Sequence, residues 1–413
     1  MKRVLSVAGL LLLVALVLAL AVSAQEIRQV GSEGYVLIPA SSIEHPGDAG
    51  VRMHTNFQIF IPNGMHFDGS QPPINANTPA SLACVYQLVQ QVSGCPINGT
   101  TLVPTGGFGA VAIVDAFDNP NAEQDLQVYS TQFGLPACTK ANGCFSQVYA
   151  RGSQPQNDPG GWSEEIALDI EMAHAFAPNA KIILVEAKDN SDTELYFAED
   201  VATKLVQQAG GGTITNSWSG GEYPQELNDD SHFKGQGIVY FASTGDSGSA
   251  VGYPAASAFV VAAGGTRINR SKGNFLSEVG WSGSSGGKSV YEPIPAWQAP
   301  LKNMLGNKRG TPDFSAIADP STGPAVYDAD GNLGWFQIGG TSVSSPLLAG
   351  VVNGDGYKAK STTQELTGVY QYARGHYSKV WRDETSGSNR IGSCLPGWDF
   401  VTGIGSPLTP IGK

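Results

Sequence analysis

Residues 110–114 read Ala-Val-Ala-Ile-Val and residues 181–186 read Lys-Ile-Ile-Leu-Val-Glu, and apolar runs of this kind decide the fold. Three more runs follow, at residues 213–218, 237–242 and 259–263. Helical patterns alternate with them, near residues 122–133, 163–177, 192–208 and 344–355. Continuously apolar strands separated by helices are typical of a parallel sheet covered on both faces. The sequence therefore predicts a doubly wound, mostly parallel α/β fold, with ligand sites at the carboxyl ends of the strands.

The composition is that of a folded, acidic protein. Of the 413 residues 41% are hydrophobic, which excludes a mainly disordered chain. The 24 basic residues face 36 acidic ones, for a net charge of -12. This charge repels phosphate backbones, and no basic stretch stands out, so we expect no nucleic-acid partner. An acidic surface suits acidic surroundings, where some carboxylates are neutral and repel one another less.

The N-terminus has the layout of a secretory signal peptide. Lys2 and Arg3 precede an apolar run over residues 4–21, and the small residues 22–24 follow. We therefore predict a signal peptide at residues 1–24 and a secreted protein, extracellular or periplasmic. The alternative is a membrane anchor, because the run approaches the length that spans a bilayer. No later segment is long and apolar enough to span one, so we expect no stable membrane association.

Residues 25–82 are rich in Pro, Gly, Asn and Ser and show little periodicity. We predict an irregular N-terminal leader or a short propeptide there, ahead of one main domain at residues 83–413. A leader of this kind either packs on the main body or is removed from it.

The five cysteines fit an exported protein. Cys84 and Cys95 close one short loop, and Cys138 and Cys144 close another, which predicts two local disulfides. Cys394 then remains as a buried thiol. A metal site is the weaker alternative, because no Cys-x-x-Cys pair or adjacent histidine supplies ligand spacing.

Residues 339–346 read Gly-Gly-Thr-Ser-Val-Ser-Ser-Pro, between an apolar run and a helical pattern. A serine between a glycine turn and a helix start has an accessible hydroxyl. It also lies beside free backbone N–H groups that can stabilise an oxyanion. Ser342 is therefore a candidate nucleophile. The alternative is that Ser342 or Ser344 only caps the helix, as serine often does.

The helical pattern at residues 163–177 carries a pair of carboxyl groups. Ser163 is placed to cap this helix, and Glu165 falls in its first turn, where the helix dipole favours anions. Asp169 shares a face with Glu165, and its neighbours there are apolar, so this carboxyl is predicted to be buried. Two buried carboxyls can share a proton, which makes Glu165 a candidate general base oriented by Asp169. The alternative, a solvated acidic face, explains Glu164 and Glu171 well but not Asp169.

A third acidic group follows a strand-like run, in the segment Phe-Ala-Ser-Thr-Gly-Asp-Ser-Gly at residues 241–248. At the carboxyl end of a strand, Asp246 can face the site. If it is protonated, it can donate a hydrogen bond to a developing oxyanion. The alternative is an aspartate that only stabilises its own glycine turn.

Together these elements resemble the sedolisin (serine-carboxyl peptidase) family, whose fold is similar to subtilisin. The resemblance covers roughly residues 83–409, so residues 83–413 are the expected peptidase domain. It rests on Glu-x-x-x-Asp at residues 165–169, Ser-Thr-Gly-Asp at residues 243–246 and Gly-Thr-Ser at residues 340–342. These motifs occur in the order that the family shows.

The resemblance implies a role for each residue. Ser342 attacks the peptide carbonyl, Glu165 takes and returns the proton, and Asp169 holds Glu165. Asp246 and the Ser342 N–H stabilise the tetrahedral intermediate. Polypeptides are the implied substrates, and they would pair with a strand similar to the segment Ser217, Trp218, Ser219 and Gly220. A plain buried strand end is the alternative for that segment.

Two C-terminal segments, Arg-Asp-Glu at residues 382–384 and Pro-Gly-Trp-Asp at residues 396–399, resemble the calcium loop of the family. The resemblance implies a structural calcium ion. Its ligands would be the side chains of Asp383 and Asp399 and the carbonyl groups of Glu384, Leu395 and Gly397. The family usually has an apolar residue at position 384 and glycine at 395, so a turn built by Asp and Gly is the alternative.

We therefore predict a secreted, acid-active serine-carboxyl endopeptidase. One alternative is a subtilase that uses Asp115, after the run at residues 110–114, together with Ser342. That alternative lacks a suitably placed histidine. The other alternative is a catalytically inactive secreted binding module on the same fold.

Overall fold

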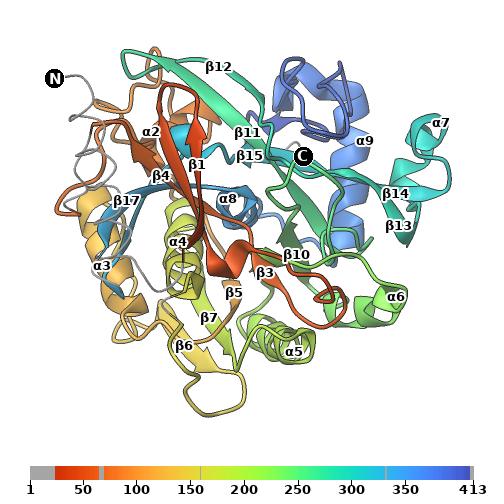
Figure 1. Ribbon diagram of the computed structural model, residues 1–413, viewed down its shortest axis with the longest axis horizontal. Helices are drawn as coiled ribbons and strands as arrows, with labels where there is room; N and C mark the ends of the chain where they lie inside the picture. Colours follow the sequence, from red (N-terminus) through yellow and green to blue (C-terminus); the bar gives the residue numbers. More distant parts are fainter. Residues whose placement is uncertain (1–23, 65–68, 159, 331–332, 410–413) are drawn as a thin grey trace, which may run out of the picture.

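The computed structural model describes residues 24–64, 69–158, 160–330 and 333–409, and a mostly parallel eight-stranded sheet forms its centre (Figure 1). The strand order is β12-β11-β10-β8-β5-β7-β6, with β15 beside β11. Only the pair β11–β12 is antiparallel. The strands are β5 (Ala110–Ala116), β6 (Phe145–Tyr149), β7 (Lys181–Ala187), β8 (Gly212–Asn216), β10 (Ile238–Ser243), β11 (Val261–Ser271), β12 (Asn274–Gly280) and β15 (Phe314–Ile317). The predicted fold class is confirmed.

Helices cover both faces of this sheet, because its strands are apolar on both sides. In β5, Val111 and Ile113 belong to one buried cluster, and Ala112 and Val114 belong to another. Successive side chains of a strand point to opposite faces, so the two clusters lie on the two sides of the sheet. The first cluster includes residues of α3 (Ala122–Phe133), α4 (Trp162–Phe176), α8 (Thr341–Gly354) and α9 (Thr362–Val380), and the second includes residues of α5 (Asp192–Gln208).

Residues 24–62 form a second sheet with distant parts of the chain, so the prediction of an irregular leader is wrong in this respect. The strand order is β1-β2-β4-β17-β16, and all four pairings are antiparallel. The strands are β1 (Ala24–Val30), β2 (Gly34–Pro39), β4 (Gln58–Pro62), β16 (Ala325–Asp328) and β17 (Gly334–Gly339). In Figure 1 the red N-terminal strands lie beside the blue β17. Two strand-forming runs, at residues 34–39 and 58–62, pair with each other across a turn-rich connection.

Shorter elements make up most of the connections. They are η1 (Ala40–Ser42), β3 (His54–Thr55), α2 (Pro79–Val85), β9 (Trp218–Ser219), α6 (Glu226–Asp229), η2 (Asp230–Phe233), β13 (Gly287–Pro293), η3 (Ala296–Leu301), α7 (Lys302–Leu305), β14 (Lys308–Thr311), η4 (Pro320–Thr322), β18 (Trp381–Arg382) and β19 (Ser406–Pro407). Residues 1–23, nearly all of the predicted signal peptide, lie outside the described residues. Within the described ranges, no helix has the length and apolar character needed to cross a membrane.

Both predicted disulfides are present. Cys84 is bonded to Cys95 and Cys138 to Cys144, and each closes a short loop. Cys394 is free and buried, as predicted.

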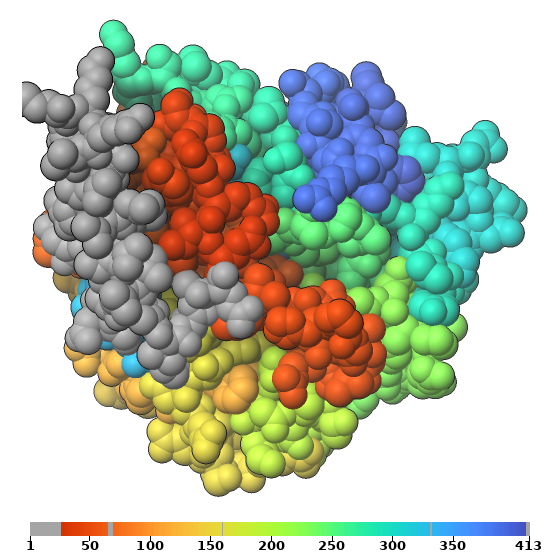
Figure 2. All heavy atoms as spheres, viewed as in Figure 1, coloured from red at the N-terminus to blue at the C-terminus, as the bar shows by residue number. Residues whose placement is uncertain are grey.

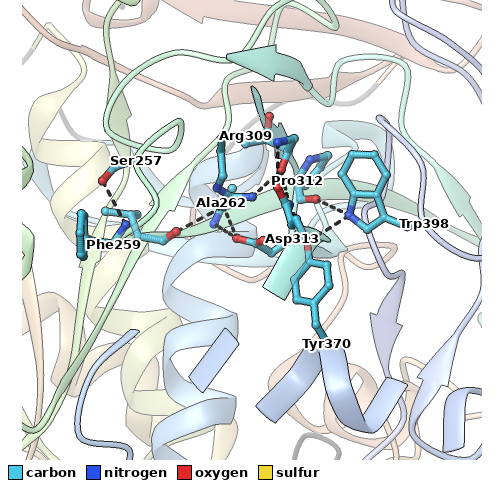
Figure 3. A network of polar contacts seen from close by, with 12 residues as sticks. Ser257, Phe259, Ala262, Arg309, Pro312, Asp313, Tyr370 and Trp398 are labelled. Atoms are coloured by element: carbon cyan, nitrogen blue, oxygen red, sulfur yellow. Dashed lines mark hydrogen bonds and ion pairs between the residues drawn. The ribbon is translucent and has the colours of Figure 1, made fainter. Parts of the chain in front are cut away.

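A buried ion pair joins the central sheet to the C-terminal part of the chain (Figure 3). Arg309 Nη2 lies 2.6 Å from Asp313 Oδ2, and both side chains are fully buried. Asp313 also accepts hydrogen bonds from the Ala262 N–H in β11 and from the Tyr370 hydroxyl in α9, each at 2.9 Å. Trp398 Nε1 donates to the same hydroxyl at 3.2 Å. One carboxylate therefore fixes the relative positions of β11, β14 and α9.

Candidate active site

Ser342 lies in the first turn of α8, directly after the turn that ends β17. The turn depends on Gly340, whose φ is 117°, and a side chain there would clash with the Asn56 carbonyl oxygen and with Asp246 Oδ2. Only glycine can adopt this conformation so close to other backbone. The helix begins at Thr341, three residues before the predicted start. Ser342 therefore has one of the backbone N–H groups that have no partner within the helix.

Neither serine caps the helix, so the capping alternative for this motif is wrong. The residue before α8 is Gly340, and no side chain caps it. Ser344 Oγ instead accepts a hydrogen bond from the Ala316 N–H at 3.0 Å.

The hydroxyl of Ser342 donates a hydrogen bond to Glu165 Oε2 at 2.9 Å. Glu165 lies in the first turn of α4, and Asp169 lies one turn further along the same helix. Both carboxyl groups are fully buried. Asp169 Oδ1 accepts a hydrogen bond from Ser217 Oγ at 2.7 Å. The fold thus brings the predicted nucleophile, base and orienting carboxyl side by side.

Helix α4 begins without the predicted serine cap. The residue before its first turn is Gly161, with φ 133°, and no side-chain hydrogen bond caps it. Ser163 lies inside the helix, and its hydroxyl lies 3.1 Å from Asn157 Oδ1 and 2.9 Å from Asp330 Oδ2. The prediction that Ser163 caps this helix is therefore wrong.

The two helix carboxyls cannot both be ionised without a large cost. Burial raises the pKa of Glu165 well above its usual range, and the charges of Asp169 and Asp115 raise it further. Burial also raises the pKa of Asp169, against the lowering effect of its hydrogen bonds with Ser217 and Glu165. Apart from the contact between the two carboxyls, Glu165 Oε1 and Asp169 Oδ2 have no hydrogen-bond partner among the described residues. One proton shared between the two carboxyls satisfies both atoms.

Asp246 follows β10 and points one oxygen at the start of α8. Its Oδ1 accepts hydrogen bonds from the Thr341 N–H at 2.8 Å and the Thr341 hydroxyl at 2.9 Å. Its Oδ2 receives no hydrogen bond from the described residues and borders the space next to Gly340. Burial raises the pKa of Asp246 to about 7, although the Thr341 hydrogen bonds act in the opposite direction. Below that pH, Oδ2 can carry a proton and donate it to an oxygen beside Gly340.

The predicted substrate strand lies at the site and already has a partner. Its residues Trp218 and Ser219 form β9, which pairs antiparallel with β3, so that Ser219 is opposite His54 and Trp218 is opposite Thr55. Ser217 precedes this strand and holds Asp169, as described above. Gly220 follows it and bridges to Tyr253. A segment of the chain itself thus pairs with the strand that the sequence predicted to bind substrate.

Asn56, which the sequence analysis did not single out, contacts Ser342 through its backbone. The Ser342 N–H donates to the Asn56 carbonyl oxygen at 3.0 Å, and the Asn56 N–H donates to Ser342 Oγ at 3.1 Å. The N–H that we expected to face a reaction intermediate is therefore bonded to Asn56. The strand-forming run that follows Asn56 is the one signal in the sequence that could have pointed to this segment.

A cleft of about 570 Å³ runs beside this segment. Ser219, Gly220, Gly245, Asp246 and Asn56 are among the residues that line it. Ser342 itself is fully buried. Figure 2 shows the red N-terminal residues lying across this face of the molecule. Ser342 does not line the cleft itself but is hydrogen-bonded to Asn56, which does.

Comparison with known proteins finds similarity to two curated proteins, kumamolisin and sedolisin. The chain is 34% identical to kumamolisin from Bacillus sp. (strain MN-32) in a 370-residue alignment that covers 81% of this chain and 62% of kumamolisin. It is 25% identical to sedolisin from Pseudomonas sp. (strain 101), over 75% of this chain and 58% of sedolisin. The chain belongs to the sedolisin family. No family model matches it.

The solved structures agree with this sedolisin-family assignment at the level of the fold. The structure of Pseudomonas sedolisin (serine-carboxyl proteinase), complexed with two molecules of pseudo-iodotyrostatin, matches with a TM-score of 0.66. The match covers 80% of this chain and 95% of that chain at 24% identity. The predicted subtilisin-like fold is therefore confirmed. The chain spans about three-fifths of the length of the two curated sedolisin-family relatives.

Among the described residues of this sedolisin-family chain, Asp115 and Ser342 do not form the site of a subtilase. Asp115 is fully buried in β5, and neither of its oxygens has a hydrogen-bond partner among the described residues. Burial raises its pKa well above the usual range, and the charges of Asp169 and Glu186 raise it further. Among the described residues, no histidine is hydrogen-bonded to Ser342 Oγ, and His54 instead contacts Asp48 Oδ2 at 2.9 Å.

Part of the predicted calcium loop converges on the hydroxyl of Tyr377. This hydroxyl lies 3.3 Å from Asp383 Oδ1 and 3.1 Å from the Gly397 carbonyl oxygen, and it also contacts the Ile404 carbonyl oxygen. A hydroxyl has one hydrogen and can satisfy only one of these three acceptors. The remaining carboxylate and carbonyl oxygens are the kind of ligand that calcium prefers.

The other predicted ligands organise their own turns. Asp399 Oδ1 accepts from the N–H groups of Val401 and Thr402 at 2.8 Å and 2.9 Å, and its Oδ2 accepts from the Leu395 N–H at 3.0 Å. The side chain of Glu384 is buried and accepts from Ser406 Oγ at 2.9 Å. This part of the loop matches the alternative of a turn built by aspartate.

Proposed function

We propose that this protein is a secreted serine-type endopeptidase that hydrolyses polypeptides at acid pH. The observation that carries the proposal is the 2.9 Å hydrogen bond from Ser342 Oγ to Glu165 Oε2. A hydroxyl paired with a base within hydrogen-bond reach, the base being oriented by a further group, is the arrangement that activates a nucleophile. Kumamolisin and sedolisin, the curated relatives, support the same class of reaction.

In the proposed reaction, Ser342 Oγ attacks the peptide carbonyl carbon while its proton passes to Glu165 Oε2. A proton on Glu165 Oε1 moves at the same time to Asp169 Oδ2, the other atom without a hydrogen-bond partner among the described residues apart from the contact between the two carboxyls. The pair thus takes up one proton without placing two charges in a buried site. The proton then returns to the leaving amine, as general acid–base catalysis requires.

The tetrahedral intermediate places negative charge on the former carbonyl oxygen. A protonated Asp246 Oδ2 would donate to this oxygen beside Gly340, and the Ser342 N–H would be the second donor. The Thr341 hydrogen bonds hold Asp246 Oδ1, which leaves Oδ2 free to carry the proton. Because a carboxyl donates only when protonated, the proposed activity belongs to acid pH.

Export is supported by two features of the chain. Residues 1–24 have the layout of a signal peptide, and the two disulfides are of the kind that persists in oxidising compartments.

We also propose that the C-terminal loop binds a structural calcium ion. Asp383 and Gly397 would supply oxygens at the point where the Tyr377 hydroxyl now lies, and Asp399 would add a carboxylate.

A digestion assay tests the proposed peptidase activity. The full chain is incubated with casein at pH 4 and pH 7, beside Ser342→Ala and the matched control Ser231→Ala, whose serine is exposed and donates a hydrogen bond to the Asn228 carbonyl oxygen. We expect wild type and Ser231→Ala to digest casein at pH 4 and Ser342→Ala to leave it intact. Digestion by Ser342→Ala at the wild-type rate would overturn the assignment. Binding of casein without digestion by wild type would favour the inactive binding module.

A further inference from the structure

The disulfide between Cys138 and Cys144 has a histidine beside it. His174, in the last turn of α4, is fully buried, and one of its ring nitrogens lies within 4.8 Å of both sulfur atoms. Among the described residues, no other group of three histidine, cysteine or acidic side chains brings its ligand atoms this close together. The sequence analysis found no histidine adjacent to these cysteines, because His174 comes later in the chain and meets them only in the fold.

A hydrogen bond to backbone fixes which ring nitrogen of His174 is free. Its Nε2 lies 2.8 Å from the Pro136 carbonyl oxygen, which can only accept, so Nε2 carries the hydrogen of the neutral ring. Nδ1 then has a lone pair, and it has no hydrogen-bond partner among the described residues. Leaving a buried nitrogen unpaired costs free energy. Histidines that bind metal ions usually donate their other N–H to a carbonyl group in this way, which orients the ring.

The two sulfur atoms provide the remaining ligands of a zinc site once the bond between them is reduced. Zinc binds thiolate sulfur at about 2.3 Å and histidine nitrogen at about 2.0–2.1 Å, and two cysteines with one histidine are a known ligand set. Only the sulfurs have to move apart, and residues 140–143 between them are exposed, so the loop can adjust outside the core. The Ala180 carbonyl oxygen, 3.8 Å from Cys144 Sγ, or a water molecule can complete the site.

The other disulfide lacks a ligand of this kind. Cys84 Sγ lies 3.6 Å from the Val92 carbonyl oxygen, and Cys95 Sγ lies 3.8 Å from Gln91 Oε1. In the described ranges, no histidine or carboxyl group joins these two sulfurs within the spacing found at Cys138 and Cys144. The protein therefore contains a matched control, a short disulfide loop without the nitrogen ligand.

We propose that Cys138 and Cys144, when reduced, bind a zinc ion together with His174 Nδ1. A newly made chain carries both cysteines as thiols until it reaches an oxidising compartment, so the ion would occupy this place before the disulfide forms. The ion would also tie the loop between α3 and β6 to the end of α4, which the disulfide does not. The inference is independent of the proposed peptidase function.

Binding of the ion releases two protons. Each thiol loses its proton when its sulfur bonds to zinc, and His174 Nδ1 contributes a lone pair without a change of protonation. In the purified protein the disulfide must first be reduced by a phosphine. The phosphine gives two electrons to the S–S bond and takes the oxygen of one water molecule, whose two hydrogens go to the two sulfurs. A second disulfide can take these two electrons back, which restores the Cys138–Cys144 bond and releases the ion.

Metal binding to the purified full chain at pH 7 tests the site. The chain is reduced with a phosphine, freed of it, and titrated first with cobalt and then with zinc in the absence of oxygen, while circular dichroism follows its folding. We expect one cobalt ion per chain that shows the charge-transfer band of thiolate ligands, and its displacement by one zinc ion. The oxidised chain should show no such band. The band should disappear at pH 4, because protons compete with the metal for the ligands.

Variants separate the three ligands from the other cysteines. The double variant Cys84→Ser and Cys95→Ser should bind cobalt as the wild type does, whereas Cys138→Ser with Cys144→Ser should lose the band. His174→Gln, whose folding is verified in the oxidised state, should weaken zinc binding by more than roughly 10- to 100-fold, the usual effect of removing a group behind a ligand. Binding by His174→Gln as tight as that of the wild type would overturn the site.

Alkylation of the reduced wild type gives a second measurement that needs no variant. Peptide mass mapping should show that zinc slows alkylation of Cys138 and Cys144 on the order of tenfold or more and leaves Cys84 and Cys95 unprotected. Equal protection of both pairs, or a reduced chain that binds cobalt without the thiolate band, would overturn the proposal. If reduction unfolds the chain and zinc does not restore its circular dichroism, the proposal is overturned as well.

Discussion

At the scale of single residues, Ser342 and Glu165 are joined by one hydrogen bond, so replacing either one should remove the same catalytic step. We expect Ser342→Ala and Glu165→Ala each to abolish casein digestion, and the double variant to be no less active than either single one. Residues of one catalytic unit lose the same steps, so their effects do not add. Initial rates on casein at pH 4, with circular dichroism to verify folding, measure this. A double variant that is inactive beside two partly active single variants would contradict a shared role.

Asp246 should set the pH dependence of the reaction. Its pKa is raised to about 7 by burial, so it is protonated in acid and loses its proton as the pH rises through that value. We expect Asp246→Ala to lower kcat by roughly 10²- to 10³-fold, the usual effect of removing one oxyanion donor. Asp246→Asn keeps a donor at every pH, so it should retain more activity and lose less of it above pH 7. Identical pH profiles for the wild type and both variants would assign Asp246 another role.

The sequence predicted which side chains come together at this site better than which backbone does. Glu165 and Asp169 could be paired from helical spacing, and Ser342 and Asp246 could be placed at the ends of strands. Asn56 could not, because it meets Ser342 across 286 positions through backbone atoms that any residue would offer. Its side chain binds two serines that lie 163 and 187 positions away in the sequence.

At the scale of elements, continuous apolar runs revealed the buried parallel strands but not the second sheet. β5, β7 and β10 are covered on both faces, so nearly every position is apolar. β2 and β4 lie among Pro, Gly and Asn residues that suggested a loop. Their partner strands β16 and β17 lie more than 250 residues further along the chain. The residues around β2 and β4 therefore give no indication of these partners.

The Arg309–Asp313 pair should contribute strongly to the junction of β11, β14 and α9. We expect Arg309→Ala to lower the free energy of unfolding by about 3–5 kcal/mol, because it leaves a buried carboxylate without its partner. Replacing both residues together, with Arg309→Met and Asp313→Leu, should cost less than the single change. Urea unfolding measures both changes. The control is Arg28→Ala, which removes an exposed ion pair with Glu26 and should have little effect on the free energy of unfolding. Equal losses for Arg309→Ala and Arg28→Ala would contradict this role.

The C-terminal loop should respond to calcium. If the oxygens around Tyr377 bind the ion, calcium raises the melting temperature and a chelator lowers it, because the ion binds only the folded state. Asp399→Ala should remove this dependence and leave Ser342 and Glu165 in place. Thermal melting with calcium and with chelator measures both effects. If the wild-type melting curves with calcium and with chelator superimpose, the proposed calcium site is wrong and the segment is a turn built by aspartate.

At the scale of the whole molecule, buried carboxyls should make the protein more stable in acid than in base. Burial raises the pKa of Glu164, Glu186 and Glu292 to about 8 and that of Glu226 to about 9. In the unfolded chain these groups lose their protons near pH 4.5. Between that pH and their raised values the folded state therefore binds more protons, and stability falls as the pH rises. Urea unfolding at pH 5, 7 and 9 should give a decreasing free energy, and a flat or rising series would contradict the shifts.

The pairing of β4 with β17 limits where the chain can be shortened. β17 lies between β4 and β16, so removing residues 24–62 would turn it into an edge strand with a row of unpaired N–H and C=O groups. Such an edge is a template for pairing with other chains, and hence for aggregation. Removing only residues 24–56 would move the exposed edge to β4, because β2 pairs with the other side of that strand. Preparations that start at Phe57 and preparations that start after Pro62 should accordingly both associate, where the full chain remains dispersed.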